Sequence, residues 1–175
     1  MTFAGETLDT NALRTLQSDR LVDTLASLRR ADAPYWRAKL ADIPAITSVD
    51  EITRLPFTVK SEFRETFPYG MLAVPLRDVV RLHASSGTSG KPTIVAYTAA
   101  DVDVFAEVNA RALACASGGP DDIVHVAYGY GLFTGGLGLH FGVERLGAVA
   151  VPASGGNVAF QVGLLADLGA TGLAC

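Results

Sequence analysis

The segment at residues 85–93 (SSGTSGKPT) brings glycines, hydroxyl side chains and one lysine together between two strand-like runs. Glycine accepts positive φ, so backbone N–H groups in such a segment can converge on an anion. The hydroxyl groups add hydrogen-bond donors, and the lysine adds a positive charge. The segment is therefore predicted to be a phosphate-binding loop, made by the residues Ser85, Ser86, Gly87, Thr88, Ser89, Gly90 and Lys91.

This phosphate loop is not a Walker P-loop. A Walker motif needs a longer spacing before its Gly-Lys pair and a Ser or Thr directly after it. Here only Thr88 and Ser89 separate Gly87 from Gly90, and Pro92 follows the lysine. The Ser-x-x-Lys and Gly-x-Ser-x-Gly patterns of nucleophilic serines are also missing. An ordinary surface turn, which Ser/Gly-rich segments often form, remains the alternative.

A second segment with chemical potential is residues 128–136 (YGYGLFTGG), where a predicted strand ends and a predicted helix begins. Ligands of open α/β sheets bind at such strand ends. Glycines let a flat ligand approach the backbone closely, and aromatic side chains offer faces and edges to another ring. The segment therefore favours an aromatic ligand. The alternative is that Tyr130 and Phe133 only anchor the core.

The phosphate loop resembles the Ser/Thr-Ser-Gly-Thr-Thr-Gly-x-Pro signature of the adenylate-forming enzymes, the acyl- and aryl-CoA synthetase superfamily. Ser89 replaces the second threonine and keeps its hydroxyl. Within that superfamily the chain most resembles the phenylacetate–CoA ligase family, from about residue 10 to the last residue. The further matching segments are 55–60 (LPFTVK), 83–84 (HA), 128–136 (YGYGLFTGG) and 152–157 (PASGGN).

The resemblance implies an AMP-forming ligase for an aromatic acid, phenylacetate. In that family the carboxylate attacks the α-phosphate of ATP to give an acyl-adenylate and pyrophosphate, and coenzyme A then displaces AMP. ATP, Mg²⁺ and coenzyme A would be co-substrates of the full-length enzyme, and the phosphate loop would hold the outer phosphates of ATP. The acid would lie against Tyr128 and Phe133, with Gly135 and Gly136 keeping the pocket wall thin.

Family members are longer than 175 residues, and residues 171–175 (TGLAC) resemble a strand interrupted within their large N-terminal domain. The chain is therefore expected to be an N-terminal fragment without the C-terminal lid domain. No catalytic residue or metal ligand is assigned within it, and the fragment alone is not expected to complete the reaction. Two other interpretations stay open: adenylation of another aryl acid, and a non-catalytic binding or interaction module.

Composition limits the partners of the chain. Its 175 residues carry a net charge of −4 and no basic run, which argues against nucleic-acid binding. It has neither a basic leader nor an apolar run of membrane-spanning length, so a soluble, cytoplasmic protein is expected. The mean hydropathy of +0.30 is on the apolar side, and an exposed sheet edge after residue 175 would favour a homo-oligomer. Cys115 and Cys175 are expected to be reduced thiols, with Cys115 buried.

Local patterns predict the elements that position these segments. Helical periodicity predicts a helix from Asp9 to about Arg30 and a short helix after Pro34, which Trp36 anchors. Residues 43–78 should be irregular, with brief helices after Thr47 and Thr58. A cap at Thr98 opens a helix that ends at 118–119, and Asp121 and Asp122 form a solvated turn.

Strands and helices alternate through the rest of the chain. Strands are predicted at 79–84, 93–97, 123–127, 148–151 and from 171, and further helices at about 135–146 and 158–168. This order predicts an α/β fold with a mainly parallel sheet and flanking helices. The division is a helical and irregular segment over 1–78 and a nucleotide- and substrate-binding part over 79–175. His83, His125 and His140 are expected to serve packing or local hydrogen bonds, and Asn157 to cap a helix.

Overall fold

The structure is a computed structural model that describes residues 6–85 and 90–175. The described residues fall into two compact units, one formed by residues 6–79 and 90–96 and the other by residues 80–85 and 97–175. Each unit has its own hydrophobic core. The division into domains that was predicted from the sequence, residues 1–78 and 79–175, stays a prediction.

The first unit is mainly helical. Its long helix α1 (Thr10–Arg30) begins at Asp9, whose side chain accepts the N–H of Ala12 at 2.9 Å. Shorter helices follow, in the order α2 (Pro34–Lys39), the 3₁₀ turn η1 (Val49–Arg54), α3 (Lys60–Glu65) and the 3₁₀ turn η2 (Leu76–Asp78). The predicted helices therefore all form, and only η2 was not expected. The structure confirms that Trp36 anchors α2, because its indole N–H donates to the carbonyl of Met71 at 2.8 Å.

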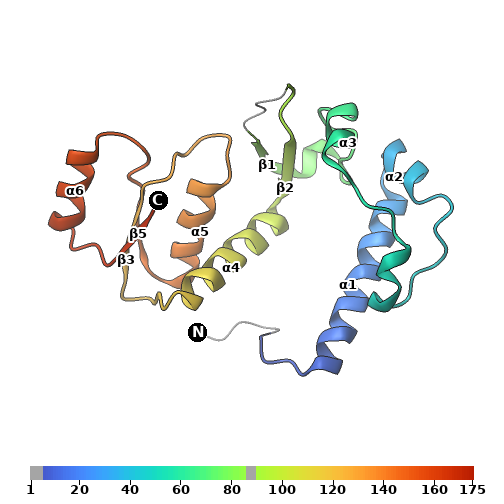
Figure 1. Cartoon of the computed structure of the whole chain (residues 1–175), viewed down its shortest axis with the longest axis horizontal. Coiled ribbons are helices and arrows are strands. Elements are labelled where there is room, and N and C mark those ends of the chain that lie inside the picture. The colour runs from blue at the N-terminus through green and yellow to red at the C-terminus, as the bar shows by residue number, and fades with distance from the viewer. Residues whose placement is uncertain (1–5, 86–89) are drawn as a thin grey trace. The chain divides into compact units, whose positions relative to one another are not determined.

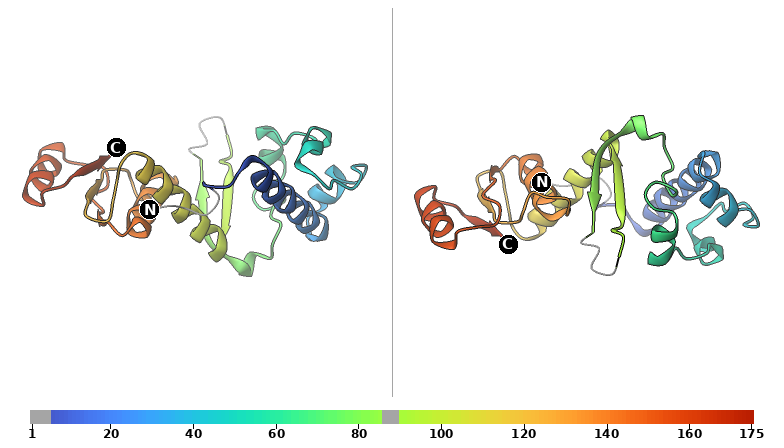
Figure 2. Two further views of the ribbon diagram at one scale, coloured as in Figure 1. Left: turned by 90° about the horizontal axis from the view of Figure 1, so that it is seen from below. Right: turned by 90° about the horizontal axis from the view of Figure 1, so that it is seen from above.

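The core of this unit lies where α1 meets the chain that returns after α2. Leu25, Leu40 and Ile46 are buried there, and further leucines and isoleucines pack around them. Figure 2 shows α1 beside α2 in both views. Of the leucines that repeat at helical spacing in α1, Leu21, Leu25 and Leu28 face this core, whereas Leu13 is 38% exposed.

The second unit has the predicted α/β arrangement. Strands β3 (Ile123–Val126), β4 (Val149–Val151) and β5 (Gly172–Ala174) form a parallel sheet in the order β4-β3-β5. Helices α4 (Ala99–Cys115) and α5 (Gly135–Leu146) lie on one side of it, and α6 (Val158–Asp167) lies on the other (Figure 1). Valines dominate its core: Val124, Val126 and Val143, with Ala148. The expectation of a mainly parallel, covered sheet is confirmed.

The strands on either side of the phosphate loop also form as predicted. β1 (Val79–Ala84) precedes it and β2 (Ile94–Thr98) follows it, and they make a separate two-stranded sheet. Helix α4 then opens with a reciprocal cap, in which Thr98 Oγ1 accepts the N–H of Asp101 at 3.2 Å and the Asp101 carboxylate accepts the N–H of Thr98 at 2.8 Å. This is the capping box that the sequence predicted.

The end of α4 differs from the expectation. The helix stops at Cys115, and Ser117, not a glycine, takes the left-handed conformation with φ of 71°. Gly118 then donates its N–H to the carbonyl of Leu113 at 2.9 Å, which closes the last turn. Cys115 is exposed and not buried as expected, because the packed face of α4 runs through Ala106 and Ala110.

Glycines bring α4 and α5 together. A Cβ atom on Gly142 would lie 2.5 Å from Cβ of Asn109 and 2.9 Å from its backbone carbonyl carbon, closer than atoms can approach. At Gly138, an added Cβ would lie 2.6 Å from the ring of Phe105. The two helices therefore pack with almost no side-chain layer between them at these points.

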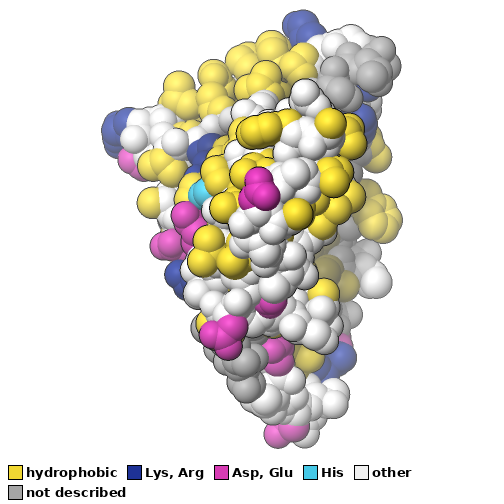
Figure 3. Space-filling view, turned by 90° about the vertical axis from the view of Figure 1, so that its left-hand side faces the viewer, with side chains coloured by type: hydrophobic (Ala, Val, Ile, Leu, Met, Phe, Trp, Pro, Cys, Tyr) yellow, Lys and Arg dark blue, Asp and Glu magenta, His cyan; other side chains and the backbone are white. Residues whose placement is uncertain are grey.

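The side of the sheet covered by α6 is unusually apolar. None of the residues of α6 is buried, and Figure 3 shows hydrophobic side chains gathered on this face. The exposed hydrophobic residues that α6 and the neighbouring strands contribute are Val149, Val158, Phe160, Val162 and Leu173. This exposed surface explains part of the high mean hydropathy of the sequence.

Candidate functional site

The phosphate loop is described only at its two ends. Ser86, Gly87, Thr88 and Ser89 lie outside the described residues. Ser85 directly follows β1, and Gly90 and Lys91 belong to the other compact unit. Gly90 has φ of 125°, a conformation that favours glycine, as predicted for this turn. The role of these seven residues in phosphate binding stays a prediction.

Lys91 is exposed, and its ammonium group lies 5.1 Å from the centre of the Phe67 ring. An ammonium group over an aromatic face gains a modest electrostatic attraction, roughly 0.5–1 kcal/mol at an exposed position. An incoming phosphate would offer a full negative charge instead. The lysine therefore presents its ammonium group at the surface.

The predicted aromatic pocket residues lie together in the structure. A Cβ atom on Gly135 would lie 3.1 Å from Cδ1 of Tyr128 and 3.6 Å from Cδ1 of Phe133, so both rings reach the first turn of α5. Both side chains are exposed, Tyr128 at 39% and Phe133 at 61%. Two exposed rings beside a glycine form a surface on which a flat aromatic group can lie.

The glycine next to them has a clear steric role. A Cβ atom on Gly136 would lie 2.6 Å from the carbonyl oxygen of Gly129 and 3.1 Å from that of Tyr128. Both contacts are with backbone, which cannot move aside without shifting the loop. Gly136 therefore lets residues 127–134 fold back against the start of α5.

Tyr130 belongs to the core, as the alternative for this residue proposed. It packs against the cluster around Val126, and its hydroxyl lies 3.3 Å from Nδ1 of His140. Burial, together with the nearby negative charge of Glu144, raises the pKa of Tyr130. Phe133, by contrast, is too exposed to be a core anchor in the described structure.

The loop at residues 127–134 is tied to the end of β1 through one carbonyl group. Leu132 O accepts the backbone N–H of Ala84 at 2.8 Å, and Nδ1 of His83 lies 3.0 Å from the same oxygen. The sequence predicted packing or a local hydrogen bond for His83. Packing is confirmed, but the hydrogen bond is not local, because it reaches 49 positions along the chain.

A second loop, residues 152–157, follows β4, the parallel neighbour of β3. Since parallel strands end at the same edge of a sheet, this loop lies on the same edge as residues 127–134, as predicted. The N–H of Ser154 donates to Val126 O at 3.0 Å. Gln161 of α6 links Ser154 O, at 3.0 Å, to Nε2 of buried His125, at 3.1 Å. Asn157 caps α6 by accepting the N–H of Phe160 at 3.2 Å, which confirms its predicted role.

Asp122 was predicted to lie in a solvated turn, but its carboxylate makes specific hydrogen bonds. Its carboxylate accepts the hydroxyl of Thr171 at 2.6 Å and the N–H of Gly119 at 2.7 Å. The hydrogen bond from the Thr171 hydroxyl, and to a smaller extent that from the N–H of Gly119, lowers the pKa of this carboxyl below its ordinary value. Asp122 therefore joins the start of β3 to the residue that precedes β5.

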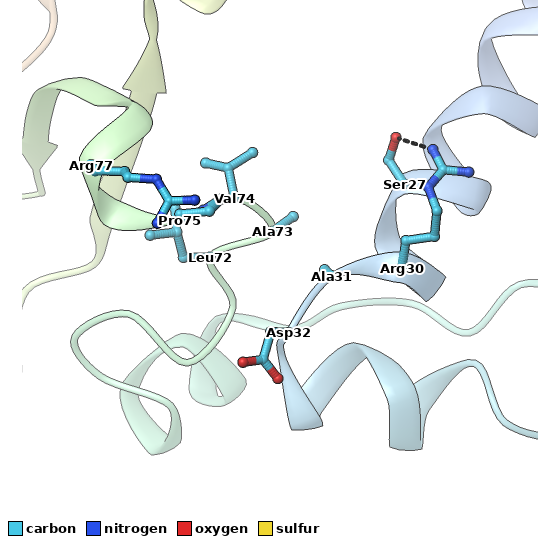
Figure 4. A pocket seen from close by; sticks show the side chains of 9 residues that line it. All are labelled: Ser27, Arg30, Ala31, Asp32, Leu72, Ala73, Val74, Pro75 and Arg77. Atoms are coloured by element: carbon cyan, nitrogen blue, oxygen red, sulfur yellow. Dashed lines mark hydrogen bonds between the residues drawn. The ribbon is translucent and has the colours of Figure 1, made fainter.

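A cavity of about 660 Å³ in the helical unit was not predicted (Figure 4). It lies between the end of α1 and the segment before η2, with Arg30 on one side and Arg77 on the other. Arg30 contacts Ser27 Oγ at 3.4 Å, while Asp32 is fully exposed. The only sequence signal for this cavity is the pair of arginines at the end of the α1 pattern.

Among residues 6–85 and 90–175, no three His, Cys, Asp or Glu side chains gather in a way that could hold a metal ion. None of the helices in the described part of the chain is long and apolar enough to cross a membrane.

Comparison with known proteins gives consistent relatives. No family model matches the chain. It is 48% identical to a phenylacetate-coenzyme A ligase of Pseudomonas putida, over 93% of this chain and 38% of that protein. It is 47% identical to the corresponding ligase of Thermus thermophilus, over 97% of this chain and 39% of that protein. A ligase of the same name from Escherichia coli is 46% identical, again over 93% of this chain and 38% of the protein.

Solved structures show the same fold. A 2-hydroxyisobutyryl-CoA ligase crystallised with 2-HIB-AMP and CoA superimposes with a TM-score of 0.86 at 26% identity, over 99% of this chain and 44% of that one. The same ligase in its postadenylation state gives a TM-score of 0.86 at 25% identity, over 99% of this chain and 40% of that one. These matches confirm the α/β fold of the adenylate-forming CoA ligases. The chain spans 38–39% of the length of the three curated relatives described above. Over nearly all of its own length, this chain is a relative of the phenylacetate–CoA ligases.

Proposed function

We propose that the chain supplies the phosphate loop and part of the acid pocket of an ATP-dependent ligase. This ligase would convert an aromatic acid, phenylacetate, through its acyl-adenylate to the coenzyme A thioester, with AMP and pyrophosphate as products. The observation that carries the proposal is the 46–48% identity to phenylacetate–CoA ligases over 93–97% of the chain. The grouping of Tyr128 and Phe133 over Gly135 supports the aromatic pocket.

The residues of the phosphate loop would act by charge and position. A carboxylate is a poor acyl donor, and attack on the α-phosphate of ATP converts it into a reactive anhydride while pyrophosphate leaves. Lys91 and the hydroxyls of the loop would hold the β- and γ-phosphates and offset the charge that develops on the leaving group. No described residue is proposed as a nucleophile. Mg²⁺ and coenzyme A would be co-substrates of the complete enzyme, and we assign no ligand for either to the described residues.

The two aromatic rings would bind the ring of the acid. Tyr128 and Phe133 present faces and edges, while Gly135 and Gly136 keep side chains out of the space beside them. Their exposure means that the described residues make only one side of such a pocket. A related aromatic acid is therefore the second candidate substrate, and titration of the natural protein with a panel of aryl acids separates the two.

The test is to measure both half-reactions in the natural protein that contains this sequence. Lys91→Ala should slow pyrophosphate release from ATP and phenylacetate by roughly 100-fold, as expected when one charged donor to a reacting phosphate is lost. Thioester formation from supplied phenylacetyl-adenylate should change far less, because the outer phosphates have already left. Lys60→Ala, at an exposed lysine of α3, is the matched control and should leave both rates unchanged. Equal losses in both half-reactions would contradict the assignment of Lys91.

A further inference from the structure

His83 is a buried, firmly held side chain near the candidate site. It lies in β1 and is only 2% exposed. Its ring meets Tyr97 edge-on, with the ring centres 5.4 Å apart and the planes at 89°, and lies 6.4 Å from the ring of Phe105. These contacts fix the orientation of the imidazole, so its nitrogen atoms point in defined directions.

The hydrogen bond of His83 fixes its tautomer. Nδ1 lies 3.0 Å from the carbonyl oxygen of Leu132, and a carbonyl oxygen can only accept, so Nδ1 carries the proton. In the neutral imidazole, which carries one ring proton, Nε2 is then the acceptor. It is buried and has no hydrogen-bond partner among the described residues. A buried acceptor without a partner is unfavourable. An apolar side chain would fill this site without that cost, so the Nδ1–H bond is the specific contribution of a histidine here.

That bond holds the loop at residues 127–134, the aromatic loop, by its backbone. Tyr130 holds the part of this loop nearer to β3 by packing in the core. Leu132, next to Phe133, has a side chain that is 68% exposed, and its carbonyl accepts both His83 Nδ1–H and the N–H of Ala84. Phe133, one of the two exposed rings, is the next residue after Leu132. Ser85, where the phosphate loop begins, is two residues after His83.

We propose that His83 is a positioning residue for aryl-acid binding. It does not touch the acid, and it acts by holding the Leu132 carbonyl, which sets the place of Phe133 relative to the strand that leads into the phosphate loop. This inference rests on the proposed function. Without this bond only the N–H of Ala84 holds the Leu132 carbonyl, so residues 127–134 are held less firmly against β1.

Three substitutions test the proposal in the natural protein. The side-chain amide nitrogen of Asn is as many bonds from Cβ as Nδ1 of histidine, so Asn can replace the Nδ1–H donor. The amide nitrogen of Gln is as many bonds from Cβ as Nε2, and Leu has no donor. His83→Gln and His83→Leu should raise KM for phenylacetate by roughly three- to tenfold, the usual effect of one lost hydrogen bond, with KM for ATP changed less than about twofold. His83→Asn should keep KM for phenylacetate within about twofold of the wild type.

The order of the variants separates positioning from packing. Asn is the smaller of the two amides and leaves the larger void, so a purely structural role predicts that His83→Asn is worse than His83→Gln. That order, or an equal rise in KM for phenylacetate and ATP, would overturn the proposal. If the wild-type protein makes no acyl-adenylate from any aryl acid, the proposed function fails instead.

Two measurements on the 175-residue chain need no activity. Amides of residues 128–134 should exchange hydrogen faster in His83→Gln and His83→Leu than in the wild type, and at the wild-type rate in His83→Asn. In the wild type, ¹⁵N NMR should show His83 protonated at Nδ1 only. A proton on Nε2 in place of Nδ1 in the wild type would refute the proposed anchor, and this result does not depend on whether any variant folds. Unchanged hydrogen exchange of residues 128–134 in all three variants would refute it as well.

Discussion

The close packing of α4 on α5 makes one substitution unusually informative. Gly142→Ala adds a Cβ atom 2.5 Å from Cβ of Asn109 and 2.9 Å from its carbonyl carbon. The second contact is with the backbone of α4, so the strain cannot be relieved by a change of rotamer. We expect α5 to be pushed away from α4, which would disturb the helix that carries Gly135 and Gly136.

The magnitude follows from two opposing effects. Overpacking a core costs about 1–3 kcal/mol, and a clash with backbone belongs in the upper half of that range. Replacing glycine by alanine inside a helix recovers about 1 kcal/mol. The free energy of unfolding should therefore fall by about 1–2 kcal/mol, which lowers Tm by roughly 2–8 °C for a chain of this size.

Gly163→Ala provides a matched control, because it is the same change in the interior of another helix. Nothing lies within 4 Å of a Cβ atom built on Gly163, so only the gain in helix propensity remains. It should stabilise the chain by about 1 kcal/mol. Urea unfolding of both variants followed by far-UV circular dichroism measures the two changes. Stabilisation by both substitutions would refute the argument, since it would mean that α4 and α5 do not approach as closely as described.

Two further predictions concern the ends of elements. Thr98→Ala removes the side-chain acceptor of the capping box at the start of α4 and should lower the free energy of unfolding by about 1 kcal/mol, measured by urea unfolding; an unchanged midpoint would contradict the cap. Asp122 has a folded-state pKa below the ordinary value of 3.8, so its stabilising effect is complete above that pH and is lost as the pH falls through the lower, folded-state pKa. Stability of Asp122→Asn should therefore depend less on pH between about pH 6 and pH 3 than that of the wild type, and parallel pH profiles would exclude this role.

Local signals made the elements predictable. The cap residues Asp9 and Thr98 and the proline at the start of α2 mark helix starts through hydrogen bonds or a φ angle that depend on only a few neighbouring residues. The end of α4 was less predictable, because Ser117 takes a conformation that glycine usually adopts. Cys115 was wrongly expected to be buried, because a helical pattern alone does not say which face of α4 will pack against the rest of the protein.

The site was predictable in part. The grouping of Tyr128, Phe133 and Gly135 agrees with the predicted segment because these residues are close in the chain and flank one strand-to-helix turn. The binding roles of these residues and of the phosphate loop remain proposals, with Lys91 as the most direct point of test. The cavity beside Arg30 had no comparable signal, because its walls come from segments at least 40 positions apart.

The sequence by itself determined the order of helices and strands, the phosphate-loop and aromatic motifs, and the relationship to the phenylacetate–CoA ligases. These depend on residue types at short, fixed spacings. Only the tertiary structure decided that the Leu132 carbonyl is held by His83, that Asp122 joins Thr171, and that Gly142 lies against Asn109. Each of these contacts joins residues 33 to 49 positions apart, where no local spacing records the pairing and only the packing of the folded chain brings the partners together.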